Sequence, residues 1–187
     1  MPVQLVEPPP AVRNTYQQSL LDLFGWREPE AKLYHLPVGT LDLPALAGGA
    51  TLRDVKSTGC RFFASWADGT LISCEMTEPS LYGNAEFRNF VQDDAVAVAF
   101  TRIAEALGLS AVQNENFELR FLSIPGIYLE ALHIVCLGDG VDLILPLVSG
   151  YEQFPVDVVL ESEAFLAQAR AIAAARLAHG ASSKLSS

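Results

Sequence analysis

The sequence has 187 residues, of which half are apolar and only 18% are charged, and this balance excludes an intrinsically disordered chain. A single domain, residues 1–187, is the simplest organisation for this length. The formal net charge of -10 disfavours nucleic acid and anionic membranes as partners, because both would repel the chain at long range.

The chain carries no recognisable targeting or membrane segment. Residues 1–10 lack the basic and apolar parts of a signal peptide, and no run of about 18 apolar residues could form a spanning helix. Cys60, Cys74 and Cys136 are odd in number and scattered through apolar, strand-like segments, which is typical of buried thiols in a reducing compartment. We therefore expect a cytoplasmic protein without a disulfide framework.

The N-terminal third is predicted to be an arm, a helix and an irregular stretch. Residues 1–11 should form an extended arm, because its consecutive prolines cannot donate backbone hydrogen bonds. A helix fits Val12–Phe24, where apolar residues recur on one side and Gly25 provides a C-terminal stop. Prolines and glycines interrupt residues 26–59, where only Lys32–Leu36 is predicted to be a strand.

The next segment is typical of a β-hairpin. Cys60–Ala67 and Thr70–Met76 are strand-like, and Asp68-Gly69 between them suits a two-residue type I′ turn. That turn would pair Phe63 with Cys74. Both faces of the hairpin would then be partly apolar, which predicts a sheet that is at least partly covered on both sides.

Loops and two more helices surround the remaining strands. We expect a loop or short helical turn over Pro79–Gln92, followed by a helix from Asp93 or Asp94 as N-cap to Leu107. A loop over Tyr151–Asp157 should precede a last helix from Ser162 to about Ala178, and residues 180–187 are predicted to be a disordered tail.

Three strands in succession form the clearest pattern of the chain. The strands are predicted over Phe117–Leu122, where apolar and charged residues alternate, and over the mainly apolar runs Tyr128–Leu137 and Val141–Val148. Pro125-Gly126 is predicted as a type II turn between the first two strands, and Asp139-Gly140 as a type I′ turn between the last two. These turns would pair Cys136 with Leu143 and give the meander one wholly apolar face. That face comprises Phe117, Leu119, Phe121, Leu132, Ile134, Cys136, Leu143, Leu145 and Leu147.

Together the segments predict an α+β fold with a mostly antiparallel sheet of about five strands. The sheet would contain two Asp-Gly hairpins, the second of them within the C-terminal three-strand meander, and helices would pack largely on one face. This order of elements in a small acidic chain is similar to that of dimeric secretion chaperones, although three strands follow the central helix in place of the usual two. The resemblance implies a chaperone-like, partner-binding function.

The opposite face of the meander holds the only candidate catalytic group. In the predicted register His133 lies opposite Glu118, with Arg120 two residues along and Asp142 across the next turn, so an imidazole beside a carboxylate could act in acid/base chemistry. The alternative is a solvated face with weak cross-strand ion pairs. Glu130 falls on the apolar face opposite Phe121, either as a buried acid or with its carboxylate reaching solvent.

No cofactor or metal site is predicted. The three histidines, at positions 35, 133 and 179, have no His or Cys partner at ligand spacing, and no nucleophile motif or complete glycine-rich phosphate loop is present. Whether the chain is an enzyme is therefore open, with a non-catalytic protein favoured.

The same face is also a candidate interface. Val135, Leu137, Ile144 and Pro146 give it an apolar centre, and Trp66 would extend it if the two hairpins share a sheet. A protein partner or a symmetric homodimer could cover it. Alternatively, the arm or residues 26–59 could cover it from within the chain. Two hypotheses follow: a soluble protein-binding, adaptor or chaperone-like protein, or a small enzyme or ligand-binding domain with a pocket near His133 and Glu118.

Overall fold

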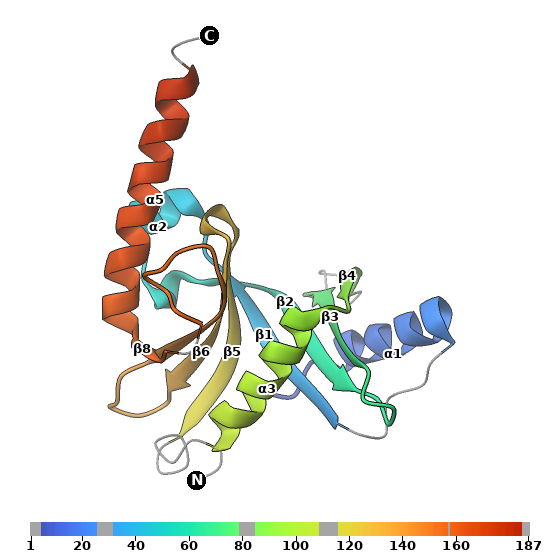
Figure 1. Cartoon of the computed structure of the whole chain (residues 1–187). Helices are drawn as coiled ribbons and strands as arrows, with labels where there is room; N and C mark the ends of the chain where they lie inside the picture. The colour runs from blue at the N-terminus through green and yellow to red at the C-terminus, as the bar shows by residue number, and fades with distance from the viewer. Residues whose placement is uncertain (1–4, 26–31, 79–84, 109–115, 157, 185–187) are drawn as a thin grey trace.

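The computed structural model of the chain describes residues 5–25, 32–78, 85–108, 116–156 and 158–184. One mixed sheet of eight strands runs through this part, in the order β4-β3-β2-β1-β5-β6-β7-β8 (Figure 1). The strands are β1 (Lys32–Thr40), β2 (Lys56–Ser65), β3 (Leu71–Thr77), β4 (Phe87–Val91), β5 (Phe117–Ile124), β6 (Leu129–Cys136), β7 (Leu143–Ser149) and β8 (Leu160–Glu161). The α+β class is confirmed, whereas the expected five strands are too few.

Four α-helices accompany the sheet in the described part of the chain. They are α1 (Pro10–Phe24), α2 (Leu43–Ala47), α3 (Asp94–Gly108) and α5 (Ser162–Lys184), with short 3-10 turns at Leu52–Asp54 and Pro125–Ile127. The predicted ends of two helices are confirmed. Gly25 ends α1 in the left-handed conformation, with φ 67°, and the Asp93 carboxylate accepts a hydrogen bond from the Val96 N–H at 3.1 Å at the start of α3.

β1 joins the two halves of the sheet. It pairs antiparallel with β2 and parallel with β5, where Val38 faces Phe121, and this is the one parallel pairing among the described strands. The sequence predicted a strand only as far as Leu36, yet β1 continues through Pro37 to Thr40. Pro37 lies just outside the ladder to β5, which starts at Val38, and a sheet tolerates proline at such a position.

The β2–β3 hairpin forms as predicted, but its register differs by one residue. Phe62 faces Cys74, whereas the predicted partner of Cys74, Phe63, faces Ser73. The loop is longer than a type I′ turn: Gly69 N–H donates to the Trp66 carbonyl at 3.0 Å, and Gly69 itself is the left-handed residue, with φ 86°. This geometry is a type I turn with a G1 bulge, which Asp-Gly also accepts.

The β6–β7 turn is also wider than predicted. The ladder ends with Ile134 facing Leu143, two residues short of the predicted Cys136–Leu143 pair, and Gly140 does not have the positive φ that a type I′ turn requires. A carboxylate oxygen of Asp142 accepts the Cys136 N–H at 2.9 Å and so satisfies a donor that the ladder leaves unpaired. Because the shift is an even number of residues, both faces of the meander keep their predicted composition.

The predicted type II turn at Pro125-Gly126 is wrong. Residues Pro125–Ile127 form a 3-10 turn, and the positive φ falls on Tyr128, at 48°. A Cβ on Gly126 would overlap the Leu43 side chain, so this glycine serves a close approach to α2 and not a positive φ.

The first face of the sheet, which includes the predicted apolar face of the meander, packs against α3. Its core draws on both halves of the sheet and on α3, which supplies Val96, Ala99 and Ile103. The nine predicted meander residues all belong to this core: Phe117, Leu119, Phe121, Leu132, Ile134, Leu145 and Leu147 are buried, and Cys136 and Leu143 are partly buried. The apolar face predicted from the sequence is therefore confirmed.

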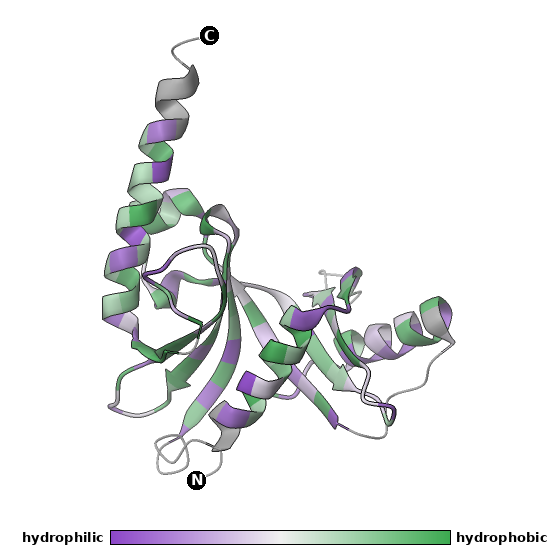
Figure 2. Ribbon diagram, in the orientation of Figure 1, coloured by the Kyte–Doolittle hydropathy of each residue, from purple (hydrophilic) through white to green (hydrophobic). Residues whose placement is uncertain are grey.

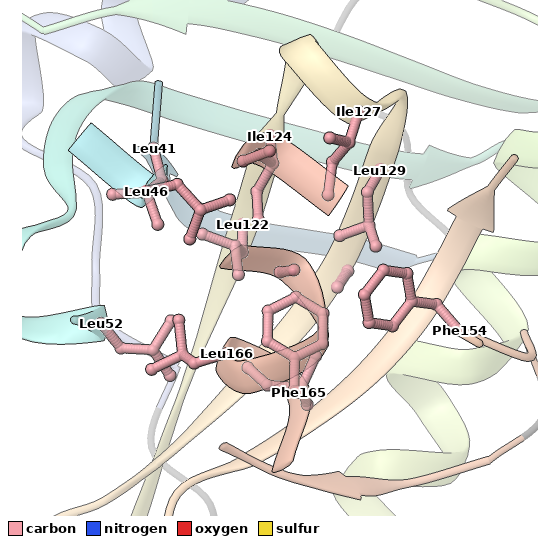
Figure 3. Packing of buried hydrophobic residues seen from close by; sticks show 14 residues of the cluster. Leu41, Leu46, Leu52, Leu122, Ile124, Ile127, Leu129, Phe154, Phe165 and Leu166 are labelled. Carbon is pink, nitrogen blue, oxygen red and sulfur yellow. The ribbon is translucent and has the colours of Figure 1, made fainter. Parts of the chain in front are cut away.

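The second face carries helices too, so the expectation that helices lie largely on one face is wrong. Tyr16 of α1 stacks on Phe62 of β2, with ring centroids 4.2 Å apart. Over β5, β6 and β7, a separate core contains Phe154 and Phe165, whose ring centroids lie 5.1 Å apart (Figure 3). Residues from α2 and α5 complete this core, and α5 then extends beyond the sheet with both hydrophobic and hydrophilic residues along its length (Figures 1 and 2).

Other element boundaries differ from the predictions. α1 begins at Pro10, inside the predicted arm of residues 1–11, because proline is well suited to the first turn of a helix. The predicted loop Pro79–Gln92 contains β4, and its residues 79–84 lie outside the described part. α5 continues to Lys184, into the predicted tail.

Candidate ligand-binding cleft

A cleft of about 330 Å³ lies between the start of α3 and the first face of the sheet. Its apolar walls include Phe63, Phe121, Val96, Ala99 and Leu147, which belong to the core under α3. Its polar lining consists of Arg61, Ser73, Asn89, Asp93 and Glu130. Apolar walls with a few convergent polar groups are typical of small-molecule sites.

Strand register brings the polar groups of β2, β3 and β4 together. Arg61 faces Glu75 across the β2–β3 ladder, and Glu75 faces Asn89 across the β3–β4 ladder. Ser73 precedes Glu75 by two residues, so its side chain points to the same face. Glu130 comes from the start of β6, on the face that parity predicted, although its partner is Ser123 and not Phe121.

Arg61 is the centre of an ion-pair network. Its Nη2 lies 2.9 Å from Glu75 Oε2, and its Nη1 lies 3.1 Å from Glu130 Oε2. Arg88 Nη1 donates to the other carboxylate oxygen of Glu75, Oε1, at 3.2 Å. The guanidinium carbon of Arg61 sits 4.2 Å from the centroid of the Phe121 ring. The charge of an arginine that is only 9% exposed is thus compensated by two carboxylates and an aromatic face.

Two polar atoms at this cleft are buried without a hydrogen-bond partner among the described residues. One is Arg61 Nε and the other is Ser73 Oγ, whose residue is 2% exposed. A buried polar group left unsatisfied costs about 1–3 kcal/mol. Because Arg61 and Ser73 both line the cleft, two such groups in its lining residues are a specific reason to consider it as a site for a hydrogen-bonding ligand.

His133, the predicted catalytic candidate, is enclosed on the second face. It faces Arg120 across the β5–β6 ladder, while Glu118 faces Val135, so the predicted His133–Glu118 pair is wrong by two residues. Glu118 binds Arg120 Nε at 2.6 Å instead. His133 is 4% exposed, and its Nε2 lies 2.9 Å from Asp142 Oδ2. The imidazole and Asp142 do meet, but the ring has almost no surface on which to receive a substrate.

The environment of His133 predicts a pH dependence of stability. Burial lowers its pKa below the ordinary 6.5, with the Asp142 hydrogen bond opposing, and burial likewise lowers the pKa of His35. As pH falls through 6.5, the unfolded chain binds protons that the folded chain does not. The free energy of unfolding should therefore fall, by at most about 1.4 kcal/mol per pH unit for each histidine. Below the folded-state pKa values this dependence should end.

Chemical denaturation at several pH values between about 7.5 and 5 tests this expectation. His133→Gln removes one of the two histidines whose pKa is lowered, so the variant should lose less stability over this range than the unsubstituted chain. Equal losses in the two proteins would show that protonation of His133 does not differ between the folded and unfolded states.

The predicted interface residues do not form one exposed patch. Ile144 is fully buried in the core beneath α5, and Pro146 is buried as well. Val135 is half-buried, Leu137 is 50% exposed, and Trp66 is partly buried beside the α1 core at the other end of the sheet. The chain itself supplies the cover, through α1 over one half of this face and α2 and α5 over the other.

Cys60 and Cys74 do not offer a nucleophile at the cleft. Burial raises the pKa of the Cys60 and Cys74 thiols to about 12, and both lie in the α1 core on the second face. A thiol with so high a pKa supplies almost no thiolate near neutral pH. Among the described residues, no group of three or more His, Cys, Asp or Glu side chains is arranged to hold a metal ion.

Arg61, Ser73 and Glu75 were not predicted as site residues from the sequence. A signal was present, because Arg61 stands between Cys60 and Phe62, and Glu75 between Cys74 and Met76, in otherwise apolar strands. Long charged residues in the middle of apolar strands are rarely buried unless they are paired. This pattern therefore predicts a buried ion pair once the two strands are placed side by side.

Comparisons of the chain with protein-family models, with curated proteins and with solved structures found no match, so no family assignment bears on the cleft. None of the helices in the described part is both long and apolar enough to cross a membrane.

Proposed function

We propose that this protein is a binding domain for a small molecule, and that the cleft over Arg61 is its site. One observation carries the proposal: Arg61 Nε and Ser73 Oγ are buried and without a hydrogen-bond partner in the described residues, at a cleft of about 330 Å³. This volume falls at the lower end of the range for small-molecule pockets.

The burial pattern of the second face also favours this function over the adaptor hypothesis. A broad exposed apolar patch would support a protein-binding surface, but Ile144 and Pro146 are buried within the chain. The pocket hypothesis is better supported, although at a different place from the predicted one near His133 and Glu118.

Binding of a protein partner or of a second copy of the chain is the second candidate. It is favoured by two apolar residues at the β6–β7 turn, Leu137 and Val141, which are 50% and 53% exposed. We propose that such a contact extends toward the charged Glu118–Arg120 pair on β5, because the Leu137 N–H donates to the Asn116 carbonyl, next to the start of that strand. A cytoplasmic location suits either function and is likewise proposed on the reduced-thiol pattern of the sequence.

Ser73→Ala tests the ligand-binding function. Because the hydroxyl is buried without a partner, removing it should leave the melting temperature unchanged or higher. Small polar and aromatic fragments should shift the backbone amide NMR signals of Ser73, Asn89 and Val96 in the unsubstituted protein. The variant should bind these fragments about threefold to tenfold more weakly, the effect of one lost hydrogen bond.

Thr101→Ala, on the exposed side of α3, is the matched control and should keep the affinity of the unsubstituted protein. The proposal is wrong if no fragment shifts the cleft amides, or if Ser73→Ala and Thr101→Ala bind the fragments equally well.

A further inference from the structure

We infer that the ligand of this cleft is a small organic cation, an amine with an apolar body and a neutral oxygen, and not an anion. This inference rests on the ligand-binding function proposed above. It follows from the charges, the apolar walls and the unpaired polar atoms of the cleft.

The charges that line the cleft sum to a negative value. Arg61 contributes one formal positive charge, whereas Glu130 and Asp93 contribute one negative charge each. The positive charge is not free to receive an anion, because the Arg61 guanidinium is already shared between Glu75 and Glu130. A carboxylate or phosphate that entered the cleft would therefore meet the carboxylates of Glu130 and Asp93, and the described residues that line the cleft include no unpaired cation to bind it.

The N-terminus of α3 does not offset this balance. The Val96 N–H donates both to Asp93 Oδ1 and to the Asp93 carbonyl oxygen, each at 3.1 Å, so this N–H of the first turn already has partners within the chain. Asp93 places a negative charge where an anion would otherwise be attracted by the helix dipole. The helix start thus adds to the preference for a cation.

Glu130 is better placed than Glu75 to meet that cation, through the carboxylate oxygen that does not bind Arg61. The side chain of Glu130 is 35% exposed, whereas the side chain of Glu75 is 12% exposed. A charge-assisted hydrogen bond from an ammonium group is roughly twice as strong as a neutral one. The overall charge of -10 would also raise the local concentration of a cation around the protein.

The other lining groups define the rest of the ligand. Phe63, Val96 and Leu147 form apolar walls that suit a hydrocarbon or aromatic body. Arg61 Nε is a donor and Ser73 Oγ can donate or accept, so a hydroxyl or carbonyl oxygen on the ligand is a complementary partner for either atom. The ligand then combines an amine near Glu130 with an oxygen near Ser73.

Three probes that differ in one group test this assignment. They are 2-amino-1-phenylethanol, 1-phenyl-1,2-ethanediol and mandelate, which share a phenyl ring and a benzylic hydroxyl but end in an ammonium, a hydroxyl and a carboxylate. In NMR titrations that follow the amides of Ser73, Asn89 and Val96, the amine should bind at least about tenfold more tightly than the diol. Mandelate should bind more weakly than either.

Two variants connect this preference to the cleft. Glu130→Gln should reduce the preference for the amine over the diol to less than about threefold, and Asp93→Asn, which keeps an oxygen for the Val96 N–H, should reduce it in the same direction. Glu118→Gln is the control, because it makes the same change of charge on the other face of the sheet, and it should keep the full preference.

The outcomes separate this inference from the proposed function. If the diol or other fragments shift the cleft amides but the amine shows no advantage, the cation assignment is wrong and the ligand-binding function stands. If mandelate binds as tightly as the amine, or if Glu118→Gln lowers the preference as much as Glu130→Gln, the assignment is also wrong. If no probe or fragment shifts the cleft amides, both proposals fail.

Discussion

Gly59→Ala is expected to destabilise the fold by about 3 kcal/mol, the upper end of the usual cost of overpacking. Gly59 faces Val38 in β1 and Thr77 in β3, so it has a strand on each side. A Cβ at this position would overlap the carbonyl oxygen of Met76 and would lie 2.9 Å from its carbonyl carbon. These are backbone atoms of β3, and they cannot move aside without breaking the β2–β3 ladder.

Chemical denaturation of Gly59→Ala and Gly138→Ala provides the comparison. Gly138 lies in the β6–β7 turn without a positive φ, and a Cβ there would meet nothing within 4 Å. The control should therefore change the free energy of unfolding by less than about 0.5 kcal/mol, as surface substitutions usually do. Similar transition midpoints for the two variants would contradict the close approach of β2 and β3 at Gly59.

The periodicity of the meander was sufficient to predict its faces but not its partners. Alternation of apolar residues placed Leu119, Leu132 and Leu145 on one side, and the core under α3 contains all three. The β6–β7 partners differ by two residues because the turn between Ile134 and Leu143 is wider than a two-residue turn, and the register shifts again at a bulge between Glu130 and Ala131. Neither feature changes the local pattern of hydrophobicity.

The local sequence pattern of β1 did not predict the full length of this strand. Pro37 and Gly39 disfavour a strand when they are considered alone, yet the segment lies at the centre of the sheet between β2 and β5. Its partner β5 is far away in the sequence, and the pairing is parallel, so no turn between them marks the contact. Tertiary packing here overrides propensity.

The cleft could not be predicted because the predicted register of the β2–β3 hairpin is wrong by one residue. In the predicted hairpin register Arg61 would face Met76, and Glu75 would face Phe62 on the opposite side of the sheet. The G1 bulge at Gly69 moves Arg61 opposite Glu75 and brings both to the face that α3 covers. Because both faces of this hairpin are apolar, hydrophobicity could not distinguish the two registers.

Glu75→Leu is expected to destabilise the fold by about 3–5 kcal/mol, because it removes one partner of a buried ion pair. Arg61 would keep Glu130, whose side chain is 35% exposed, but its Nη2 would face an apolar residue in place of a carboxylate 2.9 Å away. Denaturation by urea, with the slope of the transition compared between variants, measures the loss. Glu105→Gln, in a surface pair with Arg102 on α3, should cost less than about 1 kcal/mol.

The double variant Arg61→Met/Glu75→Leu separates the cost of an unpaired charge from the loss of packing. When both charges are removed, no uncompensated guanidinium is left in the core, so the double variant should be more stable than Glu75→Leu alone. Met can cover the Phe121 ring that the guanidinium now contacts at 4.2 Å, which preserves much of the packing. If the loss in the double variant equals the sum of the losses in Glu75→Leu and Arg61→Met, Arg61 and Glu75 act independently, and their ion pair does not contribute to the stability of the strands that line the cleft.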